Sequence, residues 1–320
     1  IKKHAVDGYL YGRVGEDHFV VIADEATFNE EYLYECRETL QNVLSDSVYN
    51  VRVCFGIYRT DNMNESLSFM CDKASFAVAS IKDDTHSFIA YYDDTMLEAA
   101  IKYKTIVDEF DDAIKAGEFK MYLQPQISAK TRRLTGAEAL VRRIKPDGTI
   151  ISPIDFIPVY EKSGLISRLD RYIWEQAAAK LGEWKKAGIN MSISVNISPK
   201  DFYYIDIFNT FAGLIKKYDI EPSNLKIEIT ETTIMSDVPN LMGELEELRK
   251  AGFTLEMDDF GSGYSSLNTL KDINVDVLKV DMGFIKETKN VKKSRIILAS
   301  VIKMAKELNL LIITEGVETE

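Results

Sequence analysis

The sequence lacks the features that would place it in a membrane, on nucleic acid or outside the cell. It has no apolar run near the length of about 20 residues that spans a bilayer, and it shows no signal peptide. The sequence has 39 Lys and Arg and 51 Asp and Glu, and the resulting net charge of −12 argues against a nucleic-acid polymer as partner. We expect a cytoplasmic protein; because the chain begins at Ile1 rather than Met, we also expect that a longer form can carry a sensor or membrane anchor before Ile1.

Histidine and cysteine are missing from most of the chain. All of them lie in the first hundred residues: Cys36, Cys54, Cys71, His4, His18 and His86. An odd number of cysteines without metal-ligand spacing favours a reduced compartment over a disulfide framework. Chemistry in the last two-thirds must use carboxylates, amides, hydroxyls, Lys, Arg and oxygen-bound metals, because typical zinc ligands are absent there.

The length of 320 residues suggests roughly two domains. The first, residues 1–96, has a mixed α/β pattern that opens with a hairpin, because GEDH separates two β-rich runs. Residues 97–117 have the spacing of an amphipathic connector helix that ends at Gly117. The runs of the first domain are strands at Tyr9–Val14, Phe19–Ala23, 51–57 and 87–92, and helices at 29–43 and 67–80.

Residues 118–320 alternate between apolar, β-branched runs and amphipathic helical stretches, which predicts a parallel α/β fold. The first two runs are joined by too few residues to cross over, so they should pair antiparallel. We therefore predict a (β/α)8-type (TIM-like) barrel with an antiparallel first strand. The expected strands are 121–127, 134–142, 191–197, 225–230, 253–258, 277–280 and 311–314, and the expected helices are 167–187, 205–218, 239–251 and 291–308.

Polar and charged residues end almost every one of these strands. They are Glu138, Asn196, Glu228, Glu231, Asp258, Asp259, Lys279, Asp281 and Glu315. Any one acid would ordinarily be a cap or half of a salt bridge, and Asp258–Asp259 before GSG is also typical of a turn. Because strand C-termini meet at one mouth of a barrel, where such enzymes place catalytic groups, the whole set indicates an active site.

Crowded carboxylates repel one another unless cations neutralise them. Oxygen ligands with one amide suit magnesium or manganese. Two ions about 3.5–4 Å apart can clamp a phosphodiester and activate water between them. Asp258 can bridge such ions with Asp259 beside it, and Lys279 can hold the water or stabilise developing charge.

The first domain resembles GGDEF (diguanylate cyclase) domains. The resemblance is carried by RVGEDHFVVI, VRVCFGI and CDKASFAVASIK. Glu16 replaces a glycine that lets nucleotide phosphate approach, and His18 replaces an acid. The inhibitory Arg-x-x-Asp of the family would fall on Val6 and Tyr9 and is absent. This implies a degenerate, regulatory domain that makes no product.

The second domain resembles EAL-domain cyclic-di-GMP phosphodiesterases over Met121 to the chain end. The motifs run in order through YLQPQI, GAEALVR, FIPVYEKSGLISRLD, SVNIS, IEITET, DDFGSGYSSL, LKVDMGFI and TEGVET. The resemblance implies metal-dependent hydrolysis of cyclic di-GMP to 5′-pGpG with Mg²⁺ or Mn²⁺. It implies that Glu138, Asn196, Glu228 and Asp258 hold one metal and that Asp258, Asp259 and Glu315 hold a second. The implied catalytic residues are Lys279, Glu315, Glu138 and Asp259. Gln124 and Arg142 are implied to contact the substrate, and Glu231 to anchor a loop.

Three features depart from the family. Glu256 occupies a position that is usually small and apolar, and strand alternation points it into the barrel, so we expect Lys226 or Lys279 to neutralise it. Met282 replaces a frequent arginine, with no effect that we can derive. The closing strand, last helix and a further substrate-side glutamine would follow Glu320, so we expect an incomplete barrel with exposed sheet edges.

Two other functions stay open. The barrel could bind cyclic di-GMP without cleaving it and relay its occupancy to a partner, a receptor that an incomplete mouth would favour. It could also be a lyase that uses Lys279 with magnesium, although the motif series does not support this. The family further suggests a homodimer that forms through the loop after Asp259.

Overall fold

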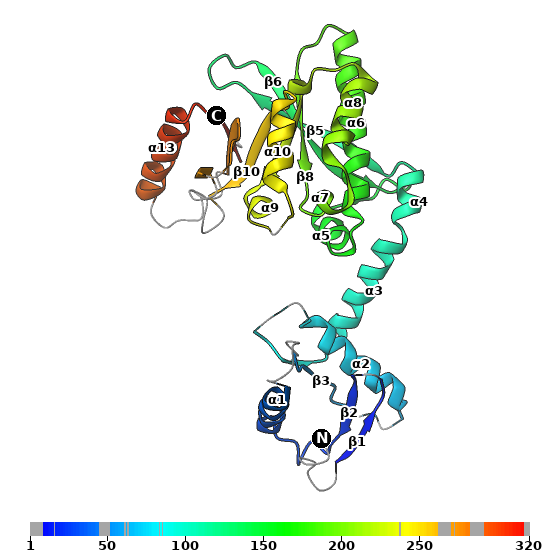
Figure 1. The fold of residues 1–320 in the computed structure, drawn as a ribbon. Helices are drawn as coiled ribbons and strands as arrows, with labels where there is room; N and C mark the ends of the chain where they lie inside the picture. The colour runs from blue at the N-terminus through cyan, green and yellow to red at the C-terminus, as the bar shows by residue number, and fades with distance from the viewer. Residues whose placement is uncertain are drawn as a thin grey trace. The chain divides into compact units, whose positions relative to one another are not determined.

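The computed structural model describes residues 9–15, 17–44, 52–60, 62, 64–82, 84, 86–236, 238–261, 270–271, 273–281 and 291–316. The chain divides into two compact units, Ile1–Thr105 and Ile106–Glu320 (Figure 1). No helix in the described ranges is long and apolar enough to cross a membrane.

The first unit has the predicted order of strands and helices. Its opening hairpin is antiparallel, as expected, with Leu10 opposite Ile22. Within the described part the strands form two separate two-stranded sheets, because the hairpin pairs only with itself while the other two strands pair in parallel. The elements are β1 (Leu10–Arg13), β2 (Phe19–Ile22), α1 (Glu31–Leu44), β3 (Phe55–Ile57), α2 (Leu67–Ser80) and β4 (Ile89–Tyr91).

The predicted connector is helical and consists of two helices, α3 (Asp94–Asp108) and α4 (Phe110–Lys115), divided at the single residue Glu109. They meet at Glu109, whose carboxylate lies 2.6 Å from Arg143 Nη2. The spacing of apolar residues in this segment predicts a stripe of Leu97, Ile101, Ile106, Phe110 and Ile114, of which Ile101 is exposed and Phe110 is buried. Gly117 ends this segment with φ of 65°, a left-handed conformation that glycine adopts without strain.

The second unit is built on one curved sheet whose strand order is β12-β11-β10-β9-β8-β6-β5, with β7 paired to β6 (Figure 1). As predicted, the first two strands pair antiparallel, and the later neighbours in this order are parallel. The strands are β5 (Phe119–Ile127), β6 (Leu134–Ile144), β7 (Ile150–Ile151), β8 (Ser192–Ile197), β9 (Leu225–Thr230), β10 (Leu255–Phe260), β11 (Val277–Asp281) and β12 (Leu311–Glu315).

The helices of this unit lie close to the predicted ranges, with one exception. The helices after α4 are α5 (Pro153–Ser163), α6 (Ile166–Lys186), α7 (Asp201–Tyr204), α8 (Ile207–Tyr218), a 3₁₀ turn at Pro222–Asn224, α9 (Glu231–Met235), α10 (Leu241–Lys250) and α13 (Val291–Glu307). The helix predicted over 205–218 begins at Ile207, because the Asp206 carboxylate accepts the Asn209 backbone N–H at 3.0 Å and caps its first turn. The exception is the set α5, α7 and α9, which no predicted range covers.

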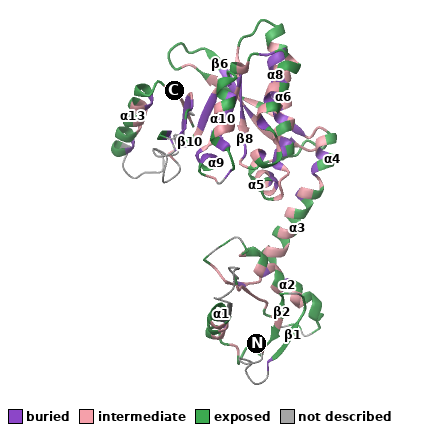
Figure 2. Ribbon diagram, in the orientation of Figure 1, coloured by how far each residue is buried: buried purple, intermediate pink, exposed green. Residues whose placement is uncertain are grey.

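The core of the second unit lies between the sheet and its helices, and the central strands are largely buried (Figure 2). Alternate strand residues such as Ile193, Ile227 and Leu255 pack there at 0% exposure. The residues between them point to the other face of the sheet. On that face Glu228 and Glu256 are also buried. The sheet therefore has an apolar outer face and a buried polar inner face.

Candidate active site

The ammonium group of Lys279 lies at the centre of a cluster of carboxylates. Its Nζ atom is 3.0 Å from Glu228, 3.1 Å from Glu138, 3.2 Å from Asp258 and 2.7 Å from Glu315. The Lys279 side chain is only 1% exposed. Five residues that the sequence predicted as site residues therefore meet at one point.

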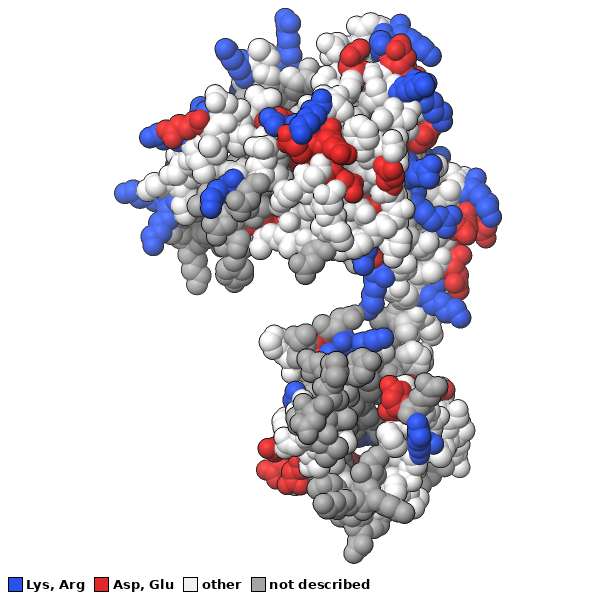
Figure 3. Space-filling view, viewed as in Figure 1, with Lys and Arg blue, Asp and Glu red and all other residues white. Residues whose placement is uncertain are grey.

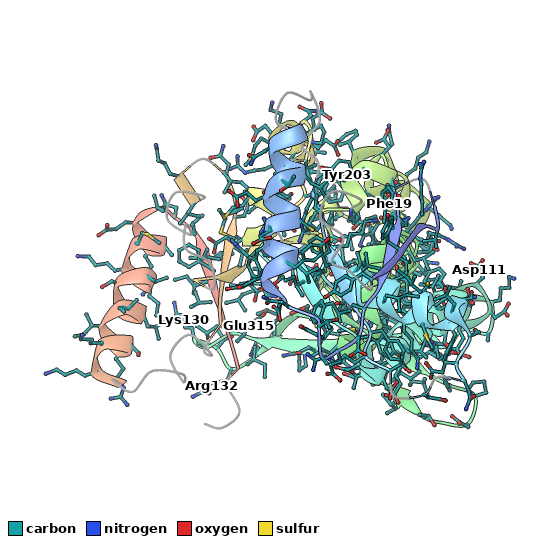
Figure 4. All side chains as sticks on the ribbon, turned by 90° about the horizontal axis from the view of Figure 1, so that it is seen from below. Phe19, Asp111, Lys130, Arg132, Tyr203 and Glu315 are labelled. Atoms are coloured by element: carbon teal, nitrogen blue, oxygen red, sulfur yellow. The ribbon has the colours of Figure 1, made fainter. Side chains whose placement is uncertain are left out.

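Each member of this cluster comes from a different strand. Glu138, Glu228, Asp258 and Glu315 lie on β6, β9, β10 and β12, and Lys279 lies on β11. Figure 4 labels Glu315 at the end of β12. Since neighbouring strands from β6 to β12 are parallel and run in register, they bring these side chains to the same edge of the sheet.

Burial and charge shift the pKa values of these groups. Burial by itself would lower the pKa of Lys279, but the carboxylates of Glu228, Glu138 and Asp258 outweigh it and raise that pKa above its ordinary value. Burial raises the pKa of Glu228 well above normal, and the Lys279 ammonium opposes that shift. Burial also raises the pKa of Glu315, again against Lys279. Lys279 thus opposes the rise in pKa that burial causes in Glu228 and Glu315.

Asn196 joins the cluster from β8. Its Nδ2 atom donates to Glu138 Oε1 at 3.4 Å, and its backbone pairs in register with Glu228 on β9. The backbone oxygen of Asn196 accepts the Trp174 indole N–H at 3.0 Å. The sequence interpretation did not include Trp174, although a Trp on the apolar stripe of a helix must find an acceptor for its N–H when buried.

The remaining predicted residues lie around this centre. Asp259 is exposed with φ of 56°, and its backbone N–H donates to Asp258 Oδ1 at 2.8 Å. Glu231 is 2% exposed at the start of α9, directly after β9. Asp281 ends β11 opposite Glu315 in the backbone register. Most of the loop that Glu231 is expected to anchor, and Met282, lie outside the described residues.

The two predicted substrate residues lie on the antiparallel pair β5–β6. Gln124 is opposite Glu138 in the register of the two strands. Arg142 follows Glu138 by four residues, so both side chains are on the same face of β6. Its guanidinium donates to the Val141 carbonyl at 2.8 Å.

Glu256 points into the interior as expected, and the structure decides between its two candidate partners. Its side chain is 0% exposed, and Lys226 Nζ lies 2.9 Å from its Oε1 atom. Lys279, the other candidate, is held by Glu138 and Glu228. These two acids belong, with Asp258 and Glu315, to the carboxylates at the edge of the sheet, here called the rim. Lys226 is therefore the lysine that neutralises Glu256.

The donor set suits a hard divalent cation. Four carboxylates outnumber the single ammonium, and the buried Glu228 Oε1 atom has no hydrogen-bond partner among the described residues. In the part of the chain that the structure describes, no three ligating side chains are arranged around a point that could hold an ion, because Lys279 takes the centre. The chemistry of these residues fits magnesium or manganese once Lys279 withdraws from that centre.

The outer surface of the second unit carries both signs of charge. On the face shown in Figure 3, acidic and basic side chains are interspersed over this unit.

A curved, largely parallel sheet with acids and a lysine at its C-terminal edge defines an α/β protein of the TIM-like barrel type. A family model described as the EAL domain matches residues 107–320, and the chain belongs to that family. The match confirms the resemblance seen in the second unit. The GGDEF resemblance of the first unit stays a prediction.

Two bacterial signalling proteins are similar to the chain in sequence. The signaling protein YkoW of Bacillus subtilis is 30% identical over 98% of this chain and 40% of its own length. The bifunctional diguanylate cyclase/cyclic di-GMP phosphodiesterase MucR of Pseudomonas aeruginosa is 29% identical over 96% of this chain and 46% of its own length. The chain thus spans less than half of either relative.

A solved structure supports the same fold. It is titled PaMucR phosphodiesterase, c-di-GMP complex, and it matches with a TM-score of 0.63 and 32% sequence identity. The match covers 68% of this chain and 88% of that one.

Proposed function

We propose that the chain is a metal-dependent phosphodiesterase that hydrolyses cyclic di-GMP to 5′-pGpG. The observation that carries this proposal is the convergence of Glu138, Glu228, Asp258 and Glu315 on Lys279 at the C-terminal edge of the sheet. The family membership and the cyclic-di-GMP complex of a similar structure support the substrate.

The proposed metal sites use the residues gathered at this edge. One ion would be held by Glu138, Asn196, Glu228 and Asp258, and a second by Asp258, Asp259 and Glu315. When bound, magnesium or manganese supplies positive charge that polarises the phosphodiester and activates water.

The protein groups have separate tasks in this proposal. Lys279 donates hydrogen bonds that hold the attacking water or stabilise charge on the phosphoryl oxygens. Arg142 pairs with a substrate phosphate through its planar guanidinium, and Gln124 lines the cleft. Glu231 anchors the loop after Asp259, the region through which we expect a homodimer to form.

For the first unit we propose a degenerate GGDEF-like domain over residues 1–96, joined by a connector over 97–117 to a barrel over 118–320. The MucR alignment supports this, since it extends over 96% of the chain and MucR is named as bifunctional. Glu16 lies outside the described residues, and His18 sits 3.0 Å from Asp17 with both side chains exposed. We expect no cyclase activity from this unit, and a cytoplasmic setting for the messenger.

The test is chromatography of the product after incubation of cyclic di-GMP with the full chain and Mg²⁺ or Mn²⁺, and separately with Ca²⁺ as a poor substitute. We expect 5′-pGpG from the wild type, little with Ca²⁺, and at least about a hundredfold loss in Glu138→Gln. The matched control is Glu247→Gln, which changes an exposed acid on α10 and should leave turnover unchanged. Full turnover by Glu138→Gln would refute the site.

The same assay tests the receptor alternative. If the chain binds cyclic di-GMP in excess metal and forms no product, the barrel is a receptor. Absence of binding to any cyclic dinucleotide would contradict both functions. Incubation of the chain with GTP and metal checks the first unit, where appreciable synthesis of cyclic di-GMP would overturn the reading of Glu16 and His18.

A further inference from the structure

A second pair of charges lies beside the rim of the barrel, in its interior. Lys226 Nζ is 2.9 Å from Glu256 Oε1, and the two side chains are 17% and 0% exposed. Burying such a pair costs free energy, because both charges lose their hydration. The attraction between the two charges often does no more than offset this cost. Hydrophobic residues of similar volume would fill the space at least as well. The pair therefore calls for an explanation other than stability.

Glu256 is the direct neighbour of a rim residue. It pairs in register with Glu228 on the adjacent parallel strand β9, so the two side chains stand next to each other on the inner face. Both are 0% exposed. Glu228 in turn contacts Lys279 at 3.0 Å. The interior thus holds an ordered row of charges: Lys226, Glu256, Glu228 and Lys279.

Lys226 has a second carboxylate within reach on its own strand. It precedes Glu228 by two residues on β9, and both point to the same face. Only one oxygen of each glutamate has a lysine partner; Glu228 Oε1 and Glu256 Oε2 have no donor among the described residues, and the two glutamate side chains lie within hydrogen-bonding reach of each other. If Glu256 were absent, Lys226 would lose its partner, and Glu228, on the same face of the same strand, is a carboxylate to which it could turn.

We infer that Glu256 is a positioning residue that holds Lys226 away from Glu228 and so leaves the Glu228 carboxylate available to a divalent cation at the rim. Its negative charge also raises the attraction of this region for cations. The inference rests on the metal-binding part of the proposed function. A purely structural ion pair would have no such effect on metal affinity.

The experiment measures Mn²⁺ binding to the full chain by titration calorimetry, with free Mn²⁺ counted by electron paramagnetic resonance. The variants are Glu256→Met and Lys226→Met/Glu256→Met. Glu118→Gln is the matched control, because it removes a carboxylate from another buried pair, with Arg143, on the outer face of β6. Thermal unfolding without metal measures the structural effect of each change separately.

In Glu256→Met, Lys226 turns to Glu228 and the dissociation constant for Mn²⁺ rises about tenfold or more, as expected for a unit charge a few ångströms away. In the double variant most of this loss is recovered, because the competing ammonium is gone. Glu118→Gln binds Mn²⁺ like the wild type.

Two results would overturn the positioning role: unchanged Mn²⁺ affinity in Glu256→Met, or a double variant as weak as the single one. A wild type that binds no Mn²⁺ would instead refute the metal-dependent function itself.

Discussion

Replacement of Lys279 by Met removes a cation that four rim carboxylates contact in this structure. The distances from Nζ are 2.7–3.2 Å, and Glu228, one of the four, is fully buried. Without the ammonium group these acids repel one another in a site that water does not reach freely. We expect the metal-free variant to be strongly destabilised and a divalent cation to restore much of the loss.

The size of the effect follows from the burial of the cluster. Removal of one partner from a buried ion pair costs about 3–5 kcal/mol. For a domain of this size, each kcal/mol shifts the thermal midpoint by roughly 2–4 °C, which gives a fall of about 6–20 °C. The carboxylates can limit the loss by taking up protons, at about 1.4 kcal/mol per pKa unit, so the fall should be larger at pH 8 than at pH 5.5.

The assay is thermal unfolding of the full chain with chelator and with Mn²⁺. Ligand at about a hundred times its Kd adds about 2.7 kcal/mol, and this gain should be larger for Lys279→Met than for the wild type, in which Lys279 competes for the same carboxylates. Lys250→Met, at an exposed position on α10, is the control and should change stability by less than about 0.5 kcal/mol. A metal-free Lys279→Met as stable as the wild type would refute the reasoning.

Three further predictions follow from contacts outside the rim. Burial raises the pKa of Asp201 to about 6. Burial and the nearby Asp201 carboxylate raise the pKa of Asp170 well above normal. Because the folded state therefore holds these protons more tightly than the unfolded chain, the free energy of unfolding is highest below pH 4 and falls as the pH rises through about 6. Asp170→Asn should flatten this decline in urea titrations, and an unchanged slope would contradict it. Arg143→Met leaves the partly exposed carboxylates of Glu118 and Glu109 without their buried cation and should cost about 1.5–3 kcal/mol in the same titrations, where a loss below about 0.5 kcal/mol would argue against it. Trp174→Phe removes the donor to the Asn196 carbonyl and should lower turnover with only about 1 kcal/mol lost from stability; equal kcat would exclude a positioning role.

Much of the second unit could be predicted because its patterns are local. Strands such as β9 and β10 show alternation that any short window reveals, and the short link between β5 and β6 requires antiparallel pairing. The division at Glu109 was not predicted because it depends on a side chain from another element, and the start of α8 was predicted to within two residues. Glu109 interrupts the connector where Arg143 of β6 binds it, and Asp206 starts α8 by capping its first turn.

The sequence by itself determined the family, the strand order and the kinds of residue that gather at the rim, because these follow from motifs and from which residue ends each strand. Only the tertiary structure decided which charges pair. It assigned Glu256 to Lys226 and placed Lys279 among four acids. The reason is physical: a lysine reaches carboxylates on neighbouring strands, and strand register and sheet curvature, neither of them local, determine which one it meets.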